Sequence, residues 1–284
     1  MRRGETVEAV HRVDAVAVRG GETVAAAGDE HLVTFLRSSA KPLQALLLAR
    51  ARPELDDTLI AIACASHRAE PEQLTAVDRL LAAVPAGEDE LECGSQDGRP
   101  AGARFHNCSG KHAGMLAVCR ARGWPTEGYV GADHPLQQAL AEEVAAVSEA
   151  AVATGVDGCG VLTFGMSLER MANAFARLEQ VDSGPRIAGA MRAHARLIGG
   201  EGSLDSQLML ALPGWIAKIG AEGLICALAP DGTGVAFKCE DGAMRPLAPA
   251  LAAFLPLLGH ELAGFARVPV TGRRGEVVGE VVVS

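Results

Sequence analysis

The chain has 284 residues and a mass of 29.3 kDa, which suits one large domain or two closely packed ones and excludes a small module stapled by disulfides. Hydrophobic residues make up 49% and charged residues 21%, as in a well-packed soluble protein, and the 4% of aromatic residues disfavours a ring-stacking ligand. A formal net charge of −9 argues against a nucleic-acid partner, because binding to a phosphate backbone normally needs a basic face.

Neither a membrane anchor nor a disulfide framework is expected from the sequence. No stretch is apolar over the length needed to cross a bilayer, and the basic pair Arg2-Arg3 has no apolar segment behind it. The seven cysteines are odd in number and scattered, which favours free thiols. We therefore expect a cytoplasmic protein with no membrane partner.

The first third of the chain predicts a hairpin, a helix and a buried strand. Alternating apolar residues over 7–27, around Arg19-Gly20-Gly21-Glu22, indicate a hairpin with which an antiparallel sheet begins. A helix is expected to start at Ser38. The apolar run Leu59–Ala65 indicates a buried strand that delivers Ser66 at its end.

The middle of the chain is mostly helical in pattern, and strands return near the end. Helices are expected near 71–84, 109–122, 134–149, 167–180, 185–197 and 204–211. Strands are expected at 214–219, 223–229 and 234–238, followed by a helix over 246–264 and a valine-rich strand at 276–283.

This order of elements predicts an α+β fold. Strands at both ends of the chain around a helical middle indicate one antiparallel sheet formed by the N- and C-terminal segments, with flanking helices and a helical lobe. We expect a single catalytic unit over 1–284, in which the sheet-containing part covers about 1–70 and 213–284 and the helical lobe about 71–212.

The most informative motif is Arg37-Ser38-Ser39-Ala40-Lys41-Pro42, a Ser-x-x-Lys-Pro element at the start of an apolar run. On a helix, residues three apart share a face, so Ser38 and Lys41 are expected to touch while Ser39 points elsewhere. A serine hydroxyl attacks poorly unless a neighbour takes its proton, and a lysine does so when burial or a nearby cation favours its neutral form. The motif therefore predicts a nucleophile with its base.

Two further elements follow in an order found in the penicillin-recognising enzymes and glutaminases. Ser66, after its predicted strand, is a candidate for their second serine, and Lys218-Ile219-Gly220, on the predicted strand from Gly214, is a candidate for their K-x-G. Each element alone is weak, because a serine and a lysine three residues apart occur by chance in many proteins. Their order strengthens the prediction.

Five segments together resemble the L-asparaginase II family, the Rhizobium-type asparaginases. They are Arg37–Gln44, Cys64–His67, His106–His112, Asp157–Gly160 and Lys218–Gly223. The resemblance implies a fold similar to serine β-lactamases and glutaminases, and hydrolysis of L-asparagine to aspartate and ammonia. It also implies a homodimer.

The resemblance assigns roles to individual residues. It implies that two serine-lysine pairs, Ser38 with Lys41 and Ser66 with Lys218, flank the substrate. It also implies a zinc site near the substrate, formed by Cys108, Lys111 and Cys159.

The chemistry of these residues is compatible with zinc. Cys108 and Lys111 are expected on one helix face, and glycines on both sides of Cys159 allow a close approach. Two thiolates with nitrogen or oxygen donors suit zinc, although a lysine binds a metal only as the neutral amine. His106, His112 and Asp157 are alternative ligands or partners that orient the ligands.

Together these residues predict an amide hydrolase with a serine acyl-enzyme. We expect neutral Lys41 to take the proton of Ser38, Ser66 to relay a proton to the departing ammonia, and Lys218 to bias that relay. Arg37, His67 and Asp157 are predicted to bind substrate, and Arg37, His67 and the metal are candidates for holding its charged α-groups.

Each of these residues also has a structural interpretation. Ser38 would be an N-cap with Lys41 in solvent, and Ser66 would cap its loop. Lys218 would be a polar residue on a strand at the edge of the sheet. Cysteines 108 and 159 would be small buried hydrophobes. Asp205 is interpreted as complementing a helix dipole, Arg99 as part of an exposed turn, and His67 as orienting its loop if it does not bind substrate.

Rival functions follow from these alternatives. A glutaminase or another serine amidohydrolase of the penicillin-recognising type would use the same residues. A non-catalytic zinc-binding protein would keep the cysteines and use the serines and lysines only in packing. A cysteine hydrolase that uses Cys108 or Cys159 is a third possibility.

Overall fold

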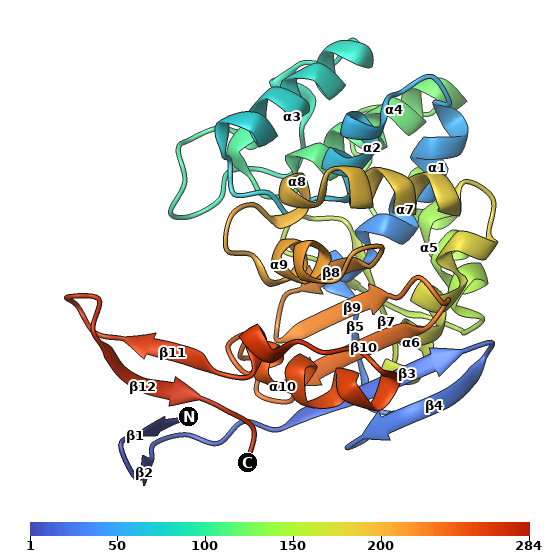
Figure 1. Ribbon diagram of the computed structural model, residues 1–284. Helices are drawn as coiled ribbons and strands as arrows, with labels where there is room; N and C mark the ends of the chain where they lie inside the picture. Colours follow the sequence, from blue (N-terminus) through green and yellow to red (C-terminus); the bar gives the residue numbers. More distant parts are fainter.

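A computed structural model describes residues 1–284, and a five-stranded antiparallel sheet forms its base (Figure 1). The strand order is β4-β3-β10-β9-β8. Its strands are β3 (Val13–Arg19), β4 (Glu22–Ala27), β8 (Ile216–Gly220), β9 (Leu224–Leu228) and β10 (Gly234–Cys239). The predicted α+β class, with an antiparallel sheet built from both parts of the chain, is confirmed.

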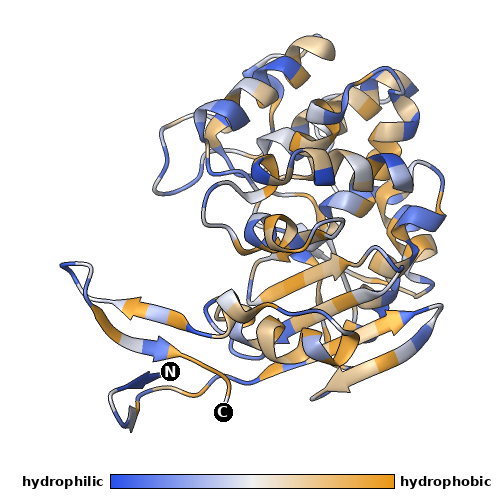
Figure 2. Cartoon of the chain, in the orientation of Figure 1, coloured by the Kyte–Doolittle hydropathy of each residue, from blue (hydrophilic) through white to orange (hydrophobic).

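The centre of this sheet is buried on both faces. All residues of β9 and β10 are buried, and the hydropathy colouring of β9 in Figure 2 reflects this. Helices α6 (Leu168–Arg177) and α10 (Leu247–Phe254) pack on the central strands. The predicted hairpin is confirmed, because Arg19 of β3 pairs with Glu22 of β4.

A layer of helices lies above the sheet in Figure 1 and carries much of the candidate site. It contains α1 (Lys41–Ala51), α2 (Asp57–Cys64), α3 (Pro71–Ala83), α4 (Ser109–Arg122), α5 (Pro135–Ser148), α7 (Gly184–Ala193), α8 (Ala195–Gly199) and α9 (Leu204–Ala211). One hydrophobic cluster of 77 buried residues runs through both the sheet and these helices, so the two layers share a single core. No helix is both long and apolar enough to cross a bilayer.

The strand predicted at Leu59–Ala65 is wrong, because this segment forms the helix α2. The Asp56 side chain accepts a hydrogen bond from the Leu59 N–H and caps the helix. Helices α1, α3, α4, α7 and α8 surround α2, so its residues from Leu59 onward are all buried. A helix that is apolar all round has no 3.6-residue periodicity and reads as a buried strand.

A three-stranded sheet occupies part of the region that was expected to be helical. Its order is β5-β7-β6, with β5 at Val33–Phe35, β6 at Ala153–Val156 and β7 at Leu162–Ser167. The strands are short, and the run of buried residues in β7 lacks alternation. This sheet matters for function because β5 leads directly to Ser38.

The two chain ends form a separate four-stranded sheet, called the arm here, which extends to the left in Figure 1. Its order is β11-β12-β1-β2, with β1 at Arg2–Arg3, β2 at Thr6–Val7, β11 at Val268–Thr271 and β12 at Val277–Val281. The predicted valine-rich strand is therefore present, but it pairs with β1 rather than with the main sheet. The helix expected over 246–264 ends at Phe254 and continues only as short 3-10 turns.

Strand β8 comes very close to the turn that carries Ser38. A Cβ added to Gly220 would lie 2.7 Å from the Leu36 carbonyl oxygen and 3.1 Å from the Ser39 Oγ. The glycine of the K-x-G element is therefore required for close approach of the backbone.

We predict that Gly220→Ala lowers the free energy of unfolding by about 1–3 kcal/mol, because overpacking forces the turn and the strand apart. Gly189→Ala is the matched control, since a Cβ there meets no atom within 4 Å. This control should be neutral or stabilising by about 0.5–1 kcal/mol, because alanine favours a helix interior. Urea unfolding measures both, and equal effects of the two substitutions would contradict the prediction.

Candidate active site

All four lysines of the chain are buried, whereas the other 22 basic residues are arginines. An arginine keeps its charge in proteins, but a buried lysine shifts readily toward the neutral amine. Three of the four, Lys41, Lys111 and Lys218, belong to the candidate site, and the fourth is Lys238 on β10. Three of the four lysines therefore lie in the candidate site, where a lysine can change its protonation state and an arginine cannot.

Ser38 lies in a 3-10 turn, Arg37–Ala40, between β5 and α1. The N–H of Leu36 donates to the Phe164 carbonyl oxygen of β7, which fixes the entry to the turn. Arg37 has a φ of +48°, a left-handed conformation that costs energy for a residue with a side chain. The Ser38 side chain is half-buried and makes no hydrogen bond within the protein, so its hydroxyl is free to turn.

The amine of Lys41 is enclosed by three oxygen atoms. Nζ lies 2.6 Å from the Ala65 carbonyl oxygen, 2.9 Å from Ser66 Oγ and 3.3 Å from the Asn107 carbonyl oxygen. Burial is the main cause that lowers the pKa of Lys41, and the positive charges of Lys218 and Lys111 add to it while the charge on Cys108 opposes it. No carboxylate contacts this amine to hold its charge.

Ser66 is positioned by the end of α2. Its N–H donates to the Ile198 carbonyl oxygen of α8 at 2.8 Å, and its hydroxyl faces Lys41 from α1. The structure thus brings Lys41 and Ser66 together. The side-chain hydrogen bonds of Lys41 go to Ser66 and two carbonyl oxygens, and none goes to Ser38.

Lys218, on β8, is fully buried and forms an ion pair with Asp205 of α9. The Nζ–Oδ2 distance is 3.0 Å, and Nζ also donates to the Ile219 carbonyl oxygen at 3.1 Å. Ser39 Oγ donates to the Lys218 carbonyl oxygen at 2.9 Å and ties the Ser38 turn to this strand. The charged end of Lys218 therefore contacts Asp205 rather than Ser66.

Asp205 was not predicted to belong to the site. Burial alone would raise its pKa, but Lys218 and hydrogen bonds from Ser203 and the Ile219 N–H outweigh burial and lower the pKa. The sequence carried a signal for an inward-facing Asp205, namely the apolar residues Leu208 and Met209 three and four positions later. Both are buried in the structure. This spacing places Asp205 on the inward face of its helix.

Arg37 and Asp157 form an ion pair next to the serine turn. Arg37 Nε donates to Asp157 Oδ1 at 2.7 Å, and the arginine side chain is 27% exposed. Asp157 Oδ1 also accepts the Gly158 N–H, which fixes the carboxylate. Two of the predicted substrate-binding residues thus lie together at the edge of the site.

The predicted metal ligands also come together. Lys111 Nζ donates to Cys159 Sγ at 3.0 Å, and the side chain of Cys159 lies against that of Cys108. The neighbouring Cys159 thiol lowers the pKa of Cys108 well below its usual range against the effect of burial, whereas the Cys108 side chain, followed by burial, raises the pKa of Cys159. Burial would lower the pKa of Lys111, but the negative charge on the sulfurs outweighs it and raises the pKa.

Two alternative ligands, both histidines, make hydrogen bonds within the protein. His106 Nδ1 accepts the N–H of Cys108, and His112 Nδ1 lies 2.8 Å from the Tyr129 hydroxyl. Two sulfur atoms and a nitrogen in a buried site are donors that zinc accepts, so the residues present fit this metal. Asp157 Oδ2 lies 3.8 Å from Cys159 Sγ and is an oxygen atom that could also ligate the metal.

His67 uses both ring nitrogens within the protein. Nδ1 accepts the Ala69 N–H at 3.1 Å, and Nε2 lies 2.7 Å from Ser109 Oγ, which in turn donates to the Arg104 carbonyl oxygen. The ring is fully buried. Arg99 Nη2 donates to the His67 carbonyl oxygen, so Arg99 supports this loop. The geometry favours the interpretation that His67 orients the loop after Ser66.

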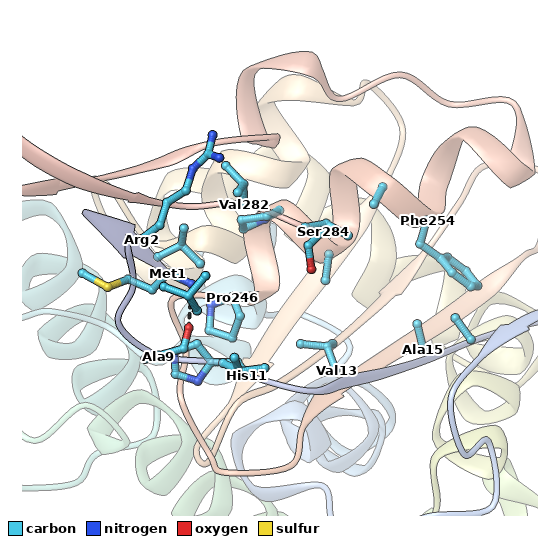
Figure 3. A pocket seen from close by; sticks show the side chains of 18 of the residues that line it. Met1, Arg2, Ala9, His11, Val13, Ala15, Pro246, Phe254, Val282 and Ser284 are labelled. Atoms are coloured by element: carbon cyan, nitrogen blue, oxygen red, sulfur yellow. Dashed lines mark hydrogen bonds between the residues drawn. The ribbon is translucent and has the colours of Figure 1, made fainter. Parts of the chain in front are cut away.

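A large cavity lies away from these residues. It has a volume of about 440 Å³, is lined mostly by apolar side chains, and opens between the arm and α10 (Figure 3). His11, at its edge, lies with Cys239 and Asp241 in a group of potential metal donors whose ligand atoms are within 4.8 Å of one another. A void of about 20 Å³ lies next to Lys41 and Lys111.

We predict that His67 makes the fold sensitive to acid. Burial, followed by the charges of Lys41 and Arg99, lowers the pKa of His67 from 6.5 to about 3. The unfolded chain therefore binds more protons between these values, and the stability that neutral His67 contributes is present above about pH 6.5 and is lost as the pH falls.

Between pH 7 and 5.5 this loss amounts to about 1 kcal/mol for His67. His67→Gln should remove that share of the pH dependence of the unfolding free energy, measured in urea. His31→Gln is the control, because the His31 side chain is 72% exposed. An unchanged pH dependence in His67→Gln would contradict the buried neutral histidine.

Comparison with known proteins identifies the family. No curated protein sequence matches the chain. Among solved structures, a β-lactamase from Mycobacterium bovis is 16% identical, with 81% of this chain and 88% of that chain covered and a TM-score of 0.40. EstCE1, a hydrolase with promiscuous acyltransferase activity, is 15% identical, with coverage of 82% and 90% and a TM-score of 0.45.

Likeness at that level supports no conclusion about catalysis in this chain. The family comparison is much more extensive, because residues 1–283 match L-asparaginase II. The match includes the serine turn, Ser66, both candidate cysteine ligands and the K-x-G strand. The chain belongs to the L-asparaginase II family.

Proposed function

We propose that the protein hydrolyses L-asparagine to aspartate and ammonia through a serine acyl-enzyme. Membership of the L-asparaginase II family supports an amidohydrolase. The observation that carries the proposal is the buried amine of Lys41, whose pKa is lowered by burial and which lies 2.9 Å from Ser66 Oγ. Such an amine is a base at the pH at which an ordinary lysine is an acid.

The three contacts of Lys41 define what the neutral amine does. A neutral amine has two hydrogens and one lone pair, and the carbonyl oxygens of Ala65 and Asn107 only accept hydrogen bonds. Both hydrogens therefore go to these carbonyls, and the lone pair is directed to the Ser66 hydroxyl. Ser66 then donates to Lys41 and serves as the proton relay.

Ser38 is the nucleophile in this scheme. Its hydroxyl is free, and it lies on the turn that enters α1 at Lys41. Its proton passes to Ser66 as the Ser66 hydroxyl gives its own proton to Lys41, and Ser38 Oγ attacks the side-chain carbonyl of asparagine. The relay through Ser66 protonates the departing ammonia, and water then cleaves the ester to release aspartate and regenerate Ser38.

The remaining polar residues bind the substrate and stabilise the developing anion. The Arg37–Asp157 pair offers one charge of each sign, which matches the α-carboxylate and the α-ammonium of an amino acid. Lys218 supplies positive charge to the developing anion, and the N–H groups of Ser38 and Gly220 line the proposed oxyanion site. His67 holds the Ser66 loop in place.

A zinc ion bound by Cys108, Lys111 and Cys159 is part of the proposal. The buried sulfurs and amine fit the metal, and when bound it supplies positive charge that holds a substrate group. A lysine and a cysteine ligate a metal only in their deprotonated forms, so Lys111 and Cys159 would each release a proton on binding. The ion is not required to generate the nucleophile.

The proposed setting is a cytoplasmic homodimer that acts on a small molecule. The net charge of −9 supports the absence of a nucleic-acid partner. Free cysteines throughout the chain are consistent with a reducing compartment. A panel of asparagine, glutamine and β-lactam substrates distinguishes the asparaginase from a glutaminase and from the penicillin-recognising type.

We predict that Ser38→Ala abolishes ammonia release from L-asparagine, with a loss of about a thousandfold or more in kcat. Ser66→Ala should lose about 10²–10⁴-fold, because the proton relay is lost while the nucleophile remains. With an aspartate β-ester, whose leaving group needs no proton, mass spectrometry should detect an acyl-enzyme in Ser66→Ala and none in Ser38→Ala. An acyl group on Ser66 in the Ser38→Ala variant would reverse the two roles.

We predict that Cys108→Ala loses zinc and raises KM more than it lowers kcat, since the ion holds substrate. Elemental analysis and steady-state kinetics measure these effects. Cys119→Ala, within helix α4, is the control, because Cys119 is a buried core residue. Retention of zinc by Cys108→Ala, or its loss only in Cys239→Ala, would place the ion elsewhere.

A further inference from the structure

Asp205 is the one carboxylate that lies fully buried among the proposed catalytic groups. It is 0% exposed and accepts four hydrogen bonds. The donors are Lys218 Nζ at 3.0 Å, the Ile219 N–H at 3.2 Å, Ser203 Oγ at 2.6 Å and the Ser206 N–H at 2.9 Å. With this many donors the carboxylate is ionised and its orientation is fixed.

The partners of the two catalytic lysines differ in one respect. Lys41 contacts two carbonyl oxygens and a hydroxyl, none of which carries a charge. Lys218 contacts a carboxylate, and both members of that ion pair are 0% exposed. A buried carboxylate stabilises the ammonium form of its neighbour, whereas burial among neutral groups stabilises the amine.

We propose that Asp205 is a positioning residue that keeps Lys218 as a fixed ammonium, so that Lys41 alone acts as the base. This inference rests on the proposed function and extends it to a residue outside the two serine-lysine pairs. One carboxylate thereby gives two buried lysines different protonation states and different tasks.

The charged groups around Lys218 are consistent with this division. Asp205 faces it from α9, Lys41 from α1 and Cys64 from α2. Burial raises the pKa of the Cys64 thiol to about 12, so Cys64 is neutral and adds no second anion. Asp205 is therefore the anion that contacts the Lys218 ammonium.

Asp205 also determines where the charge of Lys218 lies. Two of the three Nζ hydrogens are used by Asp205 and the Ile219 carbonyl oxygen, which leaves one for substrate or for the developing anion. The bond from the Ile219 N–H to Asp205 fixes the backbone just before Gly220. The carboxylate thus orients both the side chain and the strand that border the proposed oxyanion site.

The first test is Asp205→Asn, which keeps the size of the side chain and removes its charge. We expect kcat to fall at least about tenfold with KM within about twofold, since Lys218 acts on the transition state. Asp14→Asn is the matched control, because Asp14 is also a buried carboxylate but accepts a backbone N–H and no lysine. A folded Asp205→Asn with at least half of the wild-type kcat overturns the proposal.

A double-variant comparison remains informative if Asp205→Asn does not fold. Removing both charges of a buried pair is tolerated better than removing one, so Lys218→Met/Asp205→Asn is compared with Lys218→Met. We expect the two to have the same activity within about twofold, because Asp205 then has no ammonium to hold. A further tenfold loss in the double variant would give Asp205 a role of its own and overturn the proposal.

An activity-independent measurement separates this inference from the proposed function. With 13C-labelled lysine, the Cε resonance of Lys218, assigned through Lys218→Met, should keep its ammonium position between about pH 6 and 9. A wild type that lacks asparaginase activity but shows this behaviour refutes the proposed function and leaves the Asp205–Lys218 state intact. An amine-like Lys218 resonance in the wild type refutes the inference, whatever the enzyme hydrolyses.

Discussion

The contact between the buried amine of Lys41 and the Ser66 hydroxyl is the interaction on which the proposed chemistry depends. Lys41 is 1% exposed, and its amine contacts only uncharged oxygen atoms. A buried ammonium without a carboxylate partner is destabilised, so the neutral amine has the lower free energy. The same burial that destabilises the charge therefore supplies the base.

The fold assembles this contact from segments that are distant in sequence. Helix α1 carries Lys41, the end of α2 carries Ser66, and the turn before α4 supplies the Asn107 carbonyl oxygen. Strand β8 brings Lys218 against the Ser38 turn, and only a glycine at position 220 permits that approach. The helical layer and the sheet meet at the site, and neither contains all of it.

The use of lysine in this chain reflects the same constraint. Twenty-two arginines carry the positive charge elsewhere, and the four lysines are all buried. Arginine is unsuitable where a proton must leave, because it stays charged under all ordinary conditions. Three buried lysines close to two thiols, two serines and a carboxylate form a cluster in which each protonation state depends on the others.

Much of the architecture could be predicted from local patterns. The hairpin at Arg19–Glu22 and the boundaries of α4 and α9 follow from turn glycines, periodicity and capping, which act within a few residues. The helix at Asp57–Cys64 could not be predicted, because burial on all sides removes the periodic signal. Strands β5, β6 and β7 were also missed, since short strands acquire their structure from pairing across long sequence distances.

The candidate site was predicted as a set of residues but not as a set of contacts. Sequence motifs identified Ser38, Lys41, Ser66 and Lys218, but the partner of each lysine depends on tertiary packing. Lys41 contacts Ser66, and Lys218 contacts Asp205, a residue interpreted from sequence only as a helix-end charge. Spacing along the chain determines which side chains share a helix face, but it does not determine what packs against that face.

The most direct test of the central claim is the protonation state of Lys41 in the folded protein. The chain has only four lysines, so the 13Cε resonances of labelled lysine are few, and Lys41→Met assigns the one of interest. The buried lysine on β10, Lys238, provides a reference through Lys238→Met. The account predicts that Lys41 changes from ammonium to amine below the ordinary lysine value of 10.5 and in parallel with the rise of kcat/KM for L-asparagine. A Lys41 resonance that remains ammonium-like throughout the pH range of activity would contradict it.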